Sequence, residues 1–410
     1  MSHLKNLKNL TISIDEIDEN EEINEETKKE IELKNEIEEY NLFLDASSMK
    51  EKLNENERQI LLSKNNNFLN ELLNYMEGEN YINDISIKYI NSNPEILKIS
   101  KSIFLTKENL SFENLLNTRN LKSEFKILKL ITETENHRKN QIEILKNIKR
   151  NNNRYSDILP FNFNYVPYQN NIYEQNNQNE WYINASYING PFINDEKCFI
   201  AAQAPLKNSI PKFYKMIFNN NIKLIIMLCS FEEEGRKKCE YYLPKNKYLE
   251  EEIEENKLYI KIIKEEKLFC SNIIKREIEI KYENIKKTFI HIQMLNWPDY
   301  SFPDEKLGYE TIKYIIECIA ESRKKYDKYP VLIHCSAGVG RTGTLIAIFN
   351  IIKCISFFKF VNYDFQVKPF FSVFNIVRKL REQRWGMVSC HEQYIFIYKF
   401  LFFWILNYYS

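Results

Sequence analysis

The pattern of apolar and polar positions changes near residue 115 of this 410-residue chain. Upstream, apolar residues recur at helical spacing between polar stretches, as in NNFLNELLNYMEG at 66–78. Downstream, short apolar runs rich in β-branched residues predict strands at 224–228, 258–263, 287–295 and 330–334. Helical patterns lie among these runs at 211–220, 309–326 and 344–355. Strands that alternate with helices indicate an α/β domain.

This change divides the chain into three predicted parts. Residues 1–47 are acidic and short of aromatic residues, which is typical of a disordered segment or an exposed helix. Residues 48–114 are predicted to be a helical extension of unknown role, and residues 115–405 the α/β domain. Within that domain, the charged run YLEEEIEENK at 248–257 is predicted to be a solvated loop.

The charge of the chain gives no reason to expect a nucleic-acid ligand, because 57 basic residues balance 57 acidic ones. The acidic residues are unevenly placed, with 13 of them and only 3 lysines between Asp15 and Glu39. The eight cysteines form no CxxC pair, so they predict neither a zinc site nor a disulfide framework.

Both ends of the chain bear on its location. The first residues, MSHLKNLKNL, lack the apolar core of a secretion signal, so a cytoplasmic protein is expected. The tail YIFIYKFLFFWIL is very apolar, but Lys399 interrupts it and it is shorter than the ~20 residues of a membrane span. We therefore expect a buried final helix, with a weak membrane contact as the alternative.

Glycine is scarce in the chain and concentrated in one place. Of 8 glycines, Gly338, Gly340 and Gly343 fall within six residues, between an apolar run at 331–334 and a helical pattern. A strand, a glycine-rich turn and a helix N-terminus form an anion site, because successive backbone N–H groups point inward and the helix dipole adds positive potential. The lysine of a nucleotide-binding P-loop is missing, so a different anion is expected.

The same turn begins with Cys335 and carries Arg341 six residues later. The N–H groups and the helix dipole stabilise a thiolate at such a place, and a planar guanidinium binds two oxygens of a tetrahedral oxyanion. A nucleophile beneath a phosphate site indicates phosphoryl transfer through a phosphocysteine intermediate. The alternative is a buried structural cysteine in an ordinary strand-to-helix turn, and the complete run HCSAGVGRTG disfavours it.

That run, from His334 to Gly343, matches the signature HCxxGxxR[ST]G, and the chain resembles the protein tyrosine phosphatases, specifically their phosphotyrosine-specific, cysteine-dependent branch. Further motifs of the family follow in order over about residues 115–405. They are NNNRYSDILPFN, YINASYI, FIAAQAPLKNSIPKFYKMI, EEGRKKCEYYLP, NWPDYSFP and RWGMVSCHEQYIFIY. The resemblance implies the family fold, a twisted mixed β-sheet flanked by helices.

The resemblance also implies roles for the residues of the turn. Cys335 matches the nucleophile and Arg341 the phosphate clamp, while His334 matches a histidine that helps to fix the thiolate. Thr342 matches a hydroxyl beside the sulfur, and it also suits a helix N-cap. The remaining turn residues would bind the equatorial phosphate oxygens through their N–H groups: Ser336, Ala337, Gly338, Val339 and Gly340.

Residues outside the turn match the rest of the family's active site. Asp299 matches the general acid, which protonates a phenolate whose pKa is otherwise near 10. Tyr155 matches the aromatic wall of a deep pocket, Asp157 the carboxylate that holds the peptide backbone, and Gln393 a pocket glutamine. Supporting residues are Glu233 (with Glu232 and Glu234 one register away), Lys238, Trp297, Pro298, Arg381, Gly386 and Ser389.

Two features depart from the family pattern. Ser389 replaces the glutamine that positions the attacking water, so we expect a fast first step and a slow second step. Residues 353–372 are more apolar than expected and do not match the family.

The sequence leaves three functions open. An active phosphatase acting on phosphotyrosine-containing proteins is favoured by Cys335, Arg341 and Asp299 together. A pseudophosphatase, which binds phosphotyrosine without turnover, is weakly favoured by Ser389. A phosphoinositide phosphatase is disfavoured because the turn SAGVG lacks lysine. Neither metal nor organic cofactor is implied, since Arg341 and backbone amides neutralise the phosphate. The extension before residue 115 could bind a protein partner or inhibit the pocket.

Overall fold

The computed structural model describes residues 121–132, 150–167, 182–191, 195–246, 248–254, 257–270, 272–304, 307–360 and 373–408. The predictions for residues 1–47 and 48–114 therefore lie outside the described residues, and so does most of the unmatched apolar stretch 353–372. The following description concerns the part of the chain given by these ranges.

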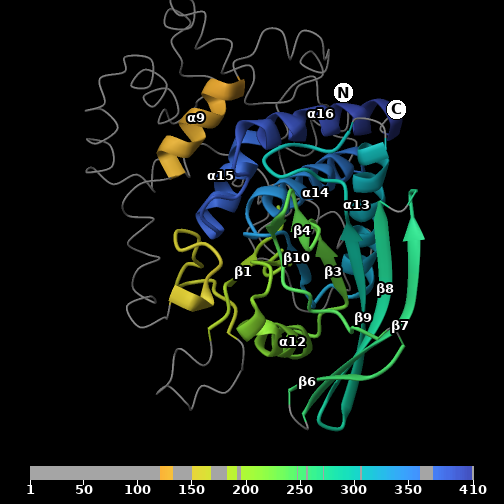
Figure 1. Cartoon of the computed structure of the whole chain (residues 1–410). Coiled ribbons are helices and arrows are strands. Elements are labelled where there is room, and N and C mark those ends of the chain that lie inside the picture. The colour runs from red at the N-terminus through yellow and green to blue at the C-terminus, as the bar shows by residue number, and fades with distance from the viewer. Residues whose placement is uncertain are drawn as a thin grey trace, which may run out of the picture.

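An eight-stranded mixed sheet forms the centre of the domain, in the order β1-β2-β10-β3-β9-β8-β7-β6 (Figure 1). The four strands β2, β10, β3 and β9 run parallel, and the outer pairings β1–β2, β9–β8, β8–β7 and β7–β6 are antiparallel. The strands are β1 Ala185–Ile188, β2 Phe199–Ala202, β3 Leu224–Met227, β6 Glu251–Glu254, β7 Leu258–Leu268, β8 Ile273–Tyr282, β9 Ile285–Met294 and β10 Val331–His334. A separate small hairpin pairs β4 Glu232–Glu233 with β5 Arg236–Lys237.

Helices cover both faces of this sheet, because its parallel strands are apolar on both sides. On β2, for example, Phe199 packs into one core and Ile200 into the other. Helix α12 Ile210–Asn219 covers the face on which Ile200 lies. Two short 3₁₀ turns are also present among the described residues, η4 Arg150–Asn152 and η5 Lys207–Ser209. The opposite face carries α13 Leu307–Lys325, α14 Gly340–Phe360, α15 Val373–Gln383 and α16 His391–Tyr408 (Figure 1).

Helix α9, Leu121–Thr132, lies against α15 and α16 and so attaches the start of the domain to its end. The rings of Phe125 and Tyr394 are 5.6 Å apart, and the Thr132 hydroxyl accepts a hydrogen bond from Arg381 at 2.7 Å. The apolar tail forms α16, whose Phe396 and Phe400 are buried, as expected for a final core helix. Among the described residues, no helix has the length and apolar character needed to cross a membrane.

The predicted mixed sheet flanked by helices is confirmed. One local prediction was wrong, because residues 248–257 contain strand β6 rather than only a solvated loop. Glu251 pairs with Ile260 and Glu252 with Tyr259, so these glutamates extend the sheet as its edge strand. Charged side chains suit an exposed edge, where they discourage pairing with another chain.

Candidate active site

The glycine-rich turn joins the carboxyl end of β10 to the start of α14, in the centre of the parallel strands. Cys335 is the first residue of the turn, and only 3% of it is exposed. Gly338 has a φ of 71°, and a Cβ there would lie 2.1 Å from the carbonyl oxygen of Ala202. Both the left-handed backbone and the close approach to β2 require glycine at this position.

The carbonyl oxygens of the turn point outward and are held there. Their donors are the N–H of Ala204 for Ser336, the Arg384 guanidinium for Ala337 and Gly338, the N–H groups of Gly343 and Val388 for Val339, and the Thr344 hydroxyl for Gly340. Because a peptide N–H points away from its carbonyl, this arrangement turns the amides toward the centre of the loop. A ring of amides at a helix N-terminus can bind an oxyanion.

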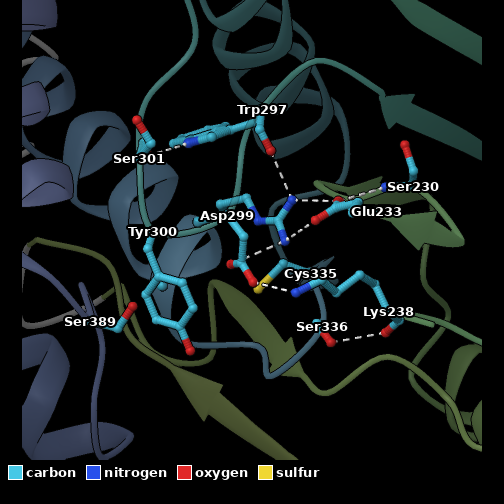
Figure 2. A network of polar contacts seen from close by, with 12 residues as sticks. Ser230, Glu233, Lys238, Trp297, Asp299, Tyr300, Ser301, Cys335, Ser336 and Ser389 are labelled. Atoms are coloured by element: carbon cyan, nitrogen blue, oxygen red, sulfur yellow. Dashed lines mark hydrogen bonds and ion pairs between the residues drawn. The ribbon is translucent and has the colours of Figure 1, made fainter. Parts of the chain in front are cut away.

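Arg341 is fixed at the far side of the turn by a bidentate ion pair with Glu233. Its terminal nitrogens lie 2.7 and 3.0 Å from the two carboxylate oxygens, and one of them also donates to the carbonyl oxygen of Trp297 at 2.8 Å. The Ser230 N–H in turn donates to Glu233 at 3.0 Å (Figure 2). Burial opposes the charge of Arg341, but the bonds to Glu233 and the nearby Cys335 outweigh it and raise the arginine pKa. The clamp is therefore a permanent cation.

Asp299 bridges two cations over the turn (Figure 2). One carboxylate oxygen lies 3.3 Å from Arg341 and the other 2.5 Å from the Lys238 ammonium. Burial lowers the pKa of Lys238, while the hydrogen bond and charge of Asp299 raise it more, so the net shift is upward. Trp297, two residues before Asp299, is buried and donates to the Ser301 carbonyl at 3.0 Å, which fixes the base of the loop 297–301. Pro298 is exposed.

The turn is flanked by His334, which precedes Cys335, and by Thr342, which follows Arg341. The Thr342 hydroxyl is fully buried and has no hydrogen-bond partner within the described residues, so it is available to a sulfur or oxygen in the site. His334 is also fully buried, and its Nδ1 lies 3.1 Å from the Cys335 carbonyl oxygen. Burial lowers the His334 pKa to about 4, so the ring is neutral near pH 7.

Tyr155 and Asp157 lie at the rim of the site. The Tyr155 hydroxyl is 3.1 Å from Ser336 Oγ, which itself donates to the Lys238 carbonyl at 2.9 Å. Asp157 is exposed. Tyr155, the turn and the backbone of Lys238 are thus joined through Ser336.

Gln393 reaches the opposite side of the turn from α16. Its Oε1 accepts hydrogen bonds from both the N–H and the hydroxyl of Ser389, each at 3.1 Å. A Cβ on Gly340 would lie within 3.0 Å of the Gln393 amide, so the amide rests against the turn. Since Oε1 is occupied, the Nε2 donors remain for a ligand.

Arg381 and Gly386 lie next to the segments that contact the turn. Arg381 donates to the carbonyl oxygens of Met387 and Val388 at 3.1 and 3.2 Å and so supports the segment that carries Ser389. Gly386 has a φ of 79°, with Val339 of the turn as its nearest neighbour. Both residues therefore shape the backbone beside the site without reaching its centre.

Two residues beside the turn, Arg384 and Tyr300, were not predicted from the sequence to belong to the site. Arg384 is fully buried and holds two carbonyls of the turn, and burial lowers its pKa to about 10. Its signal was its place at the start of RWGMVSC, two residues before Gly386. Tyr300 follows Asp299 with a φ of 52° and is 64% exposed, and its ring stands near Ser389 at the rim (Figure 2).

The ion pair between Arg341 and Glu233 supports a first prediction. Glu233→Gln is expected to lower kcat/KM for p-nitrophenyl phosphate roughly tenfold, because a bidentate ion pair becomes a single hydrogen bond from the Arg341 guanidinium to an amide oxygen. The matched control is Glu232→Gln, an exposed carboxylate on the same two-residue strand. Equal losses in the two variants would contradict the assignment of the pair to Glu233.

The chain was compared with known proteins. The family model described as protein-tyrosine phosphatase matches residues 149–403. Human tyrosine-protein phosphatase non-receptor type 12 is 32% identical over 259 residues, which cover 62% of this chain and 30% of that protein. Mouse tyrosine-protein phosphatase non-receptor type 20 is 31% identical over 309 residues, which cover 74% of this chain and 66% of that protein.

Solved structures agree with these relatives. The catalytic domain of human protein tyrosine phosphatase non-receptor type 18 matches with a TM-score of 0.58 and 25% identity, covering 72% of this chain and 98% of that one. A structure of PTPN18 in complex with HER2-pY1248 phosphopeptides matches with a TM-score of 0.59 and 25% identity, covering 69% and 99%. The chain spans less than two thirds of the length of the two curated relatives above. Because the family model covers more than half of the chain, the chain belongs to the protein-tyrosine phosphatase family.

Proposed function

We propose that this protein hydrolyses phosphotyrosine in proteins through a cysteinyl-phosphate intermediate on Cys335. The observation that carries the proposal is the place of Cys335 at the start of a ring of inward-facing amides, with Arg341 fixed by Glu233 beside it. A nucleophile under an oxyanion site with a permanent cation suits phosphoryl transfer, which needs positioning and charge neutralisation above all. The related PTPN18, crystallised with phosphotyrosine peptides, supports the substrate class.

In the first step, the Cys335 thiolate attacks phosphorus and the bond from phosphorus to the phenolic oxygen breaks. The turn amides and Arg341 neutralise the equatorial oxygens. Asp299, in its protonated form, gives its proton to the leaving oxygen, which would otherwise depart as a phenolate. The Tyr155 ring lines the pocket beside the turn. The depth of this pocket favours phosphotyrosine, because the shorter phosphoserine does not reach Cys335.

In the second step, water attacks phosphorus, the Asp299 carboxylate takes a proton from that water, and the bond from sulfur to phosphorus breaks. The Thr342 hydroxyl is free to donate to the departing sulfur. Gln393 presents its Nε2 to the site because Ser389 occupies its Oε1. One glutamine amide is thus available to hold the water in place.

The proposal is tested by trapping the intermediate. The full chain is mixed with a phosphotyrosine peptide, quenched in acid within milliseconds, digested and examined by mass spectrometry. A phosphoryl group on the peptide that carries Cys335 is the expected result, together with release of inorganic phosphate at steady state. Peptide binding without phosphate release would instead indicate a binding module of the same fold.

The position of Ser389 supports a second prediction. Wild type is expected to release p-nitrophenol in a burst and then slowly, because one amide rather than two positions the attacking water. Ser389→Gln should raise the steady-state rate several-fold and reduce the burst. Stopped-flow absorbance measures both phases. Ser389→Ala serves as the matched variant, since it removes the hydroxyl bond to Gln393 Oε1 but keeps the backbone bond and adds no amide, and it should slow turnover further. Burst-free wild-type turnover would contradict the prediction.

Two segments outside the site keep predictions that come from the sequence alone. These are a membrane contact of the C-terminal tail and a protein partner for residues 1–114.

A further inference from the structure

A row of polar side chains runs from strand to strand toward the turn. It lies on the face of the sheet that is opposite α16. Glu265 on β7, Arg276 on β8 and His291 on β9 are direct neighbours in the strand register. Arg276 Nε donates to Glu265 at 2.7 Å, and an Arg276 terminal nitrogen lies 3.4 Å from His291 Nδ1. Arg276 is 6% exposed and His291 is fully buried. Polar groups are costly at such places unless they are bonded to one another.

Tyr242 carries the row over β3 to the turn. Its hydroxyl lies 2.8 Å from His291 Nε2 and 2.8 Å from His334 Nε2, and His334 Nδ1 lies 3.1 Å from the Cys335 carbonyl oxygen. The Tyr214 hydroxyl donates to the Tyr242 carbonyl at 2.5 Å, which holds the tyrosine backbone. Four side chains therefore link the carboxylate of Glu265 on β7 with the peptide group of the nucleophile.

The groups at the two ends of the row favour one direction for its bonds. A guanidinium has no acceptor, so His291 Nδ1 accepts in its contact with Arg276, which leaves the proton on Nε2 as a donor to the Tyr242 oxygen. The backbone carbonyl of His291 is the competing partner for this ring, and Arg276 opposes it. At the other end, a carbonyl can only accept, so His334 Nδ1 carries the proton and His334 Nε2 accepts from Tyr242. With Arg276 in place, both ends thus favour a Tyr242 hydroxyl that accepts from His291 and donates to His334.

The surroundings of the row leave this direction in place. Gln293 Oε1 accepts from Arg276 at 3.1 Å, while its Nε2 donates to the Cys229 carbonyl. Met227 Sδ lies 3.6 Å from the Tyr242 hydroxyl, and a thioether accepts more weakly than an imidazole nitrogen. Burial lowers the pKa of both histidines, and Arg276 opposes a proton on His291 as well. Both rings are neutral, as the directed row requires.

We propose that Arg276 is a positioning residue for Cys335, acting through the tautomers of His291 and His334. The inference rests on the proposed function, because it assigns the row to the reactivity of the nucleophile. With Arg276 in place, His291 can bond Tyr242 only as a donor, and the Tyr242 proton is committed to His334. His334 then holds the Cys335 carbonyl outward, which keeps the peptide groups of the turn facing inward. Without Arg276, His291 can change tautomer and accept the Tyr242 proton itself.

The test reads the tautomers directly in the full chain. Long-range ¹H–¹⁵N spectra of histidine-labelled protein should show His291 protonated on Nε2 and His334 on Nδ1, and the chain has only five histidines to assign. Arg276→Met removes the ion pair of Glu265, whose side chain is 10% exposed, and can prevent folding. The main variant is therefore the double substitution Glu265→Gln with Arg276→Met, which removes both charges. Arg276→Lys, which keeps a cationic donor, is the rescue variant.

The double variant should show a mixed His291 tautomer and a fall in kcat of about fivefold to tenfold with little change in KM, as loss of one bond to the site predicts. Arg276→Lys should recover part of kcat. The matched control is the double substitution Glu382→Gln with Arg378→Met, because Arg378 is also a buried arginine paired with a carboxylate, Glu382, on α15. It should leave both tautomers and kcat unchanged.

Two results would overturn the inference: His334 protonated on Nε2 in wild type, or unchanged tautomers and kcat in the double variant. Failure of the proposed function would look different, since wild type would then lack hydrolysis that depends on Cys335 while the tautomers remained readable.

Discussion

Cys335→Ser is expected to abolish hydrolysis of phosphotyrosine peptides, with kcat at least roughly 10⁵-fold below wild type, as for loss of a nucleophile in other hydrolases. The amides of the turn and the cation of Arg341 stabilise a thiolate, but a serine hydroxyl keeps its proton near neutral pH. Stopped-flow release of p-nitrophenol should show neither a burst nor a steady phase. Binding should survive, because the amides, Arg341 and Tyr155 are unchanged.

Binding is measured by calorimetry with a phosphotyrosine peptide and its unphosphorylated form. The control is Cys318→Ser, a partly exposed thiol on α13, which should keep wild-type kcat. Residual hydrolysis within tenfold of wild type in Cys335→Ser would exclude Cys335 as the nucleophile. Loss of binding together with hydrolysis would instead indicate damage to the turn.

The parts of the fold that depend on local pattern were predictable from the sequence. The run 330–334 predicted the strand that the structure places at Val331–His334, because a short, uniformly apolar run suits a strand buried on both faces. The glycine cluster also has a local cause, since Gly338 needs both a positive φ and close contact with β2. Strand β6 was missed because its glutamates carry no apolar alternation, and only pairing with β7 makes it a strand.

The parts of the site that depend on long-range contacts were less predictable. Matching motifs suggested Glu233 but left its register open by one residue, and the structure pairs this glutamate with Arg341 at 2.7 Å. Arg384 was not singled out, because its role is visible only once α15 ends beside the turn. The row from Glu265 to His334 was missed for the same reason. Its members are spread over 93 residues of sequence, from Tyr242 to His334, and only the folded chain brings them together.

Asp299→Asn is expected to lower kcat/KM for phenyl phosphate by roughly 10² to 10⁴-fold, the usual contribution of a general acid. An amide has no acidic proton to give, so the phenolate must leave unprotonated. The loss in kcat/KM, which reports the first step alone, should shrink as the leaving group becomes more acidic, and with 2,4-dinitrophenyl phosphate it should be less than about tenfold. A series of aryl phosphates, measured at one pH, gives this dependence as a slope of log kcat/KM against leaving-group pKa. The slope should be near zero in wild type and steeply negative in the variant.

The matched control is Asp304→Asn, an exposed carboxylate on the same loop that accepts from the Leu307 N–H at 2.9 Å at the start of α13. Asparagine also accepts at such a position, so kcat and the slope should stay at wild-type values. A loss that is equal for all leaving groups would assign Asp299 a different part, that of holding Arg341 and Lys238 in place. The two ion pairs at 3.3 and 2.5 Å make that the rival explanation, and the slope decides between them, because an electrostatic bridge does not depend on how easily the leaving group departs.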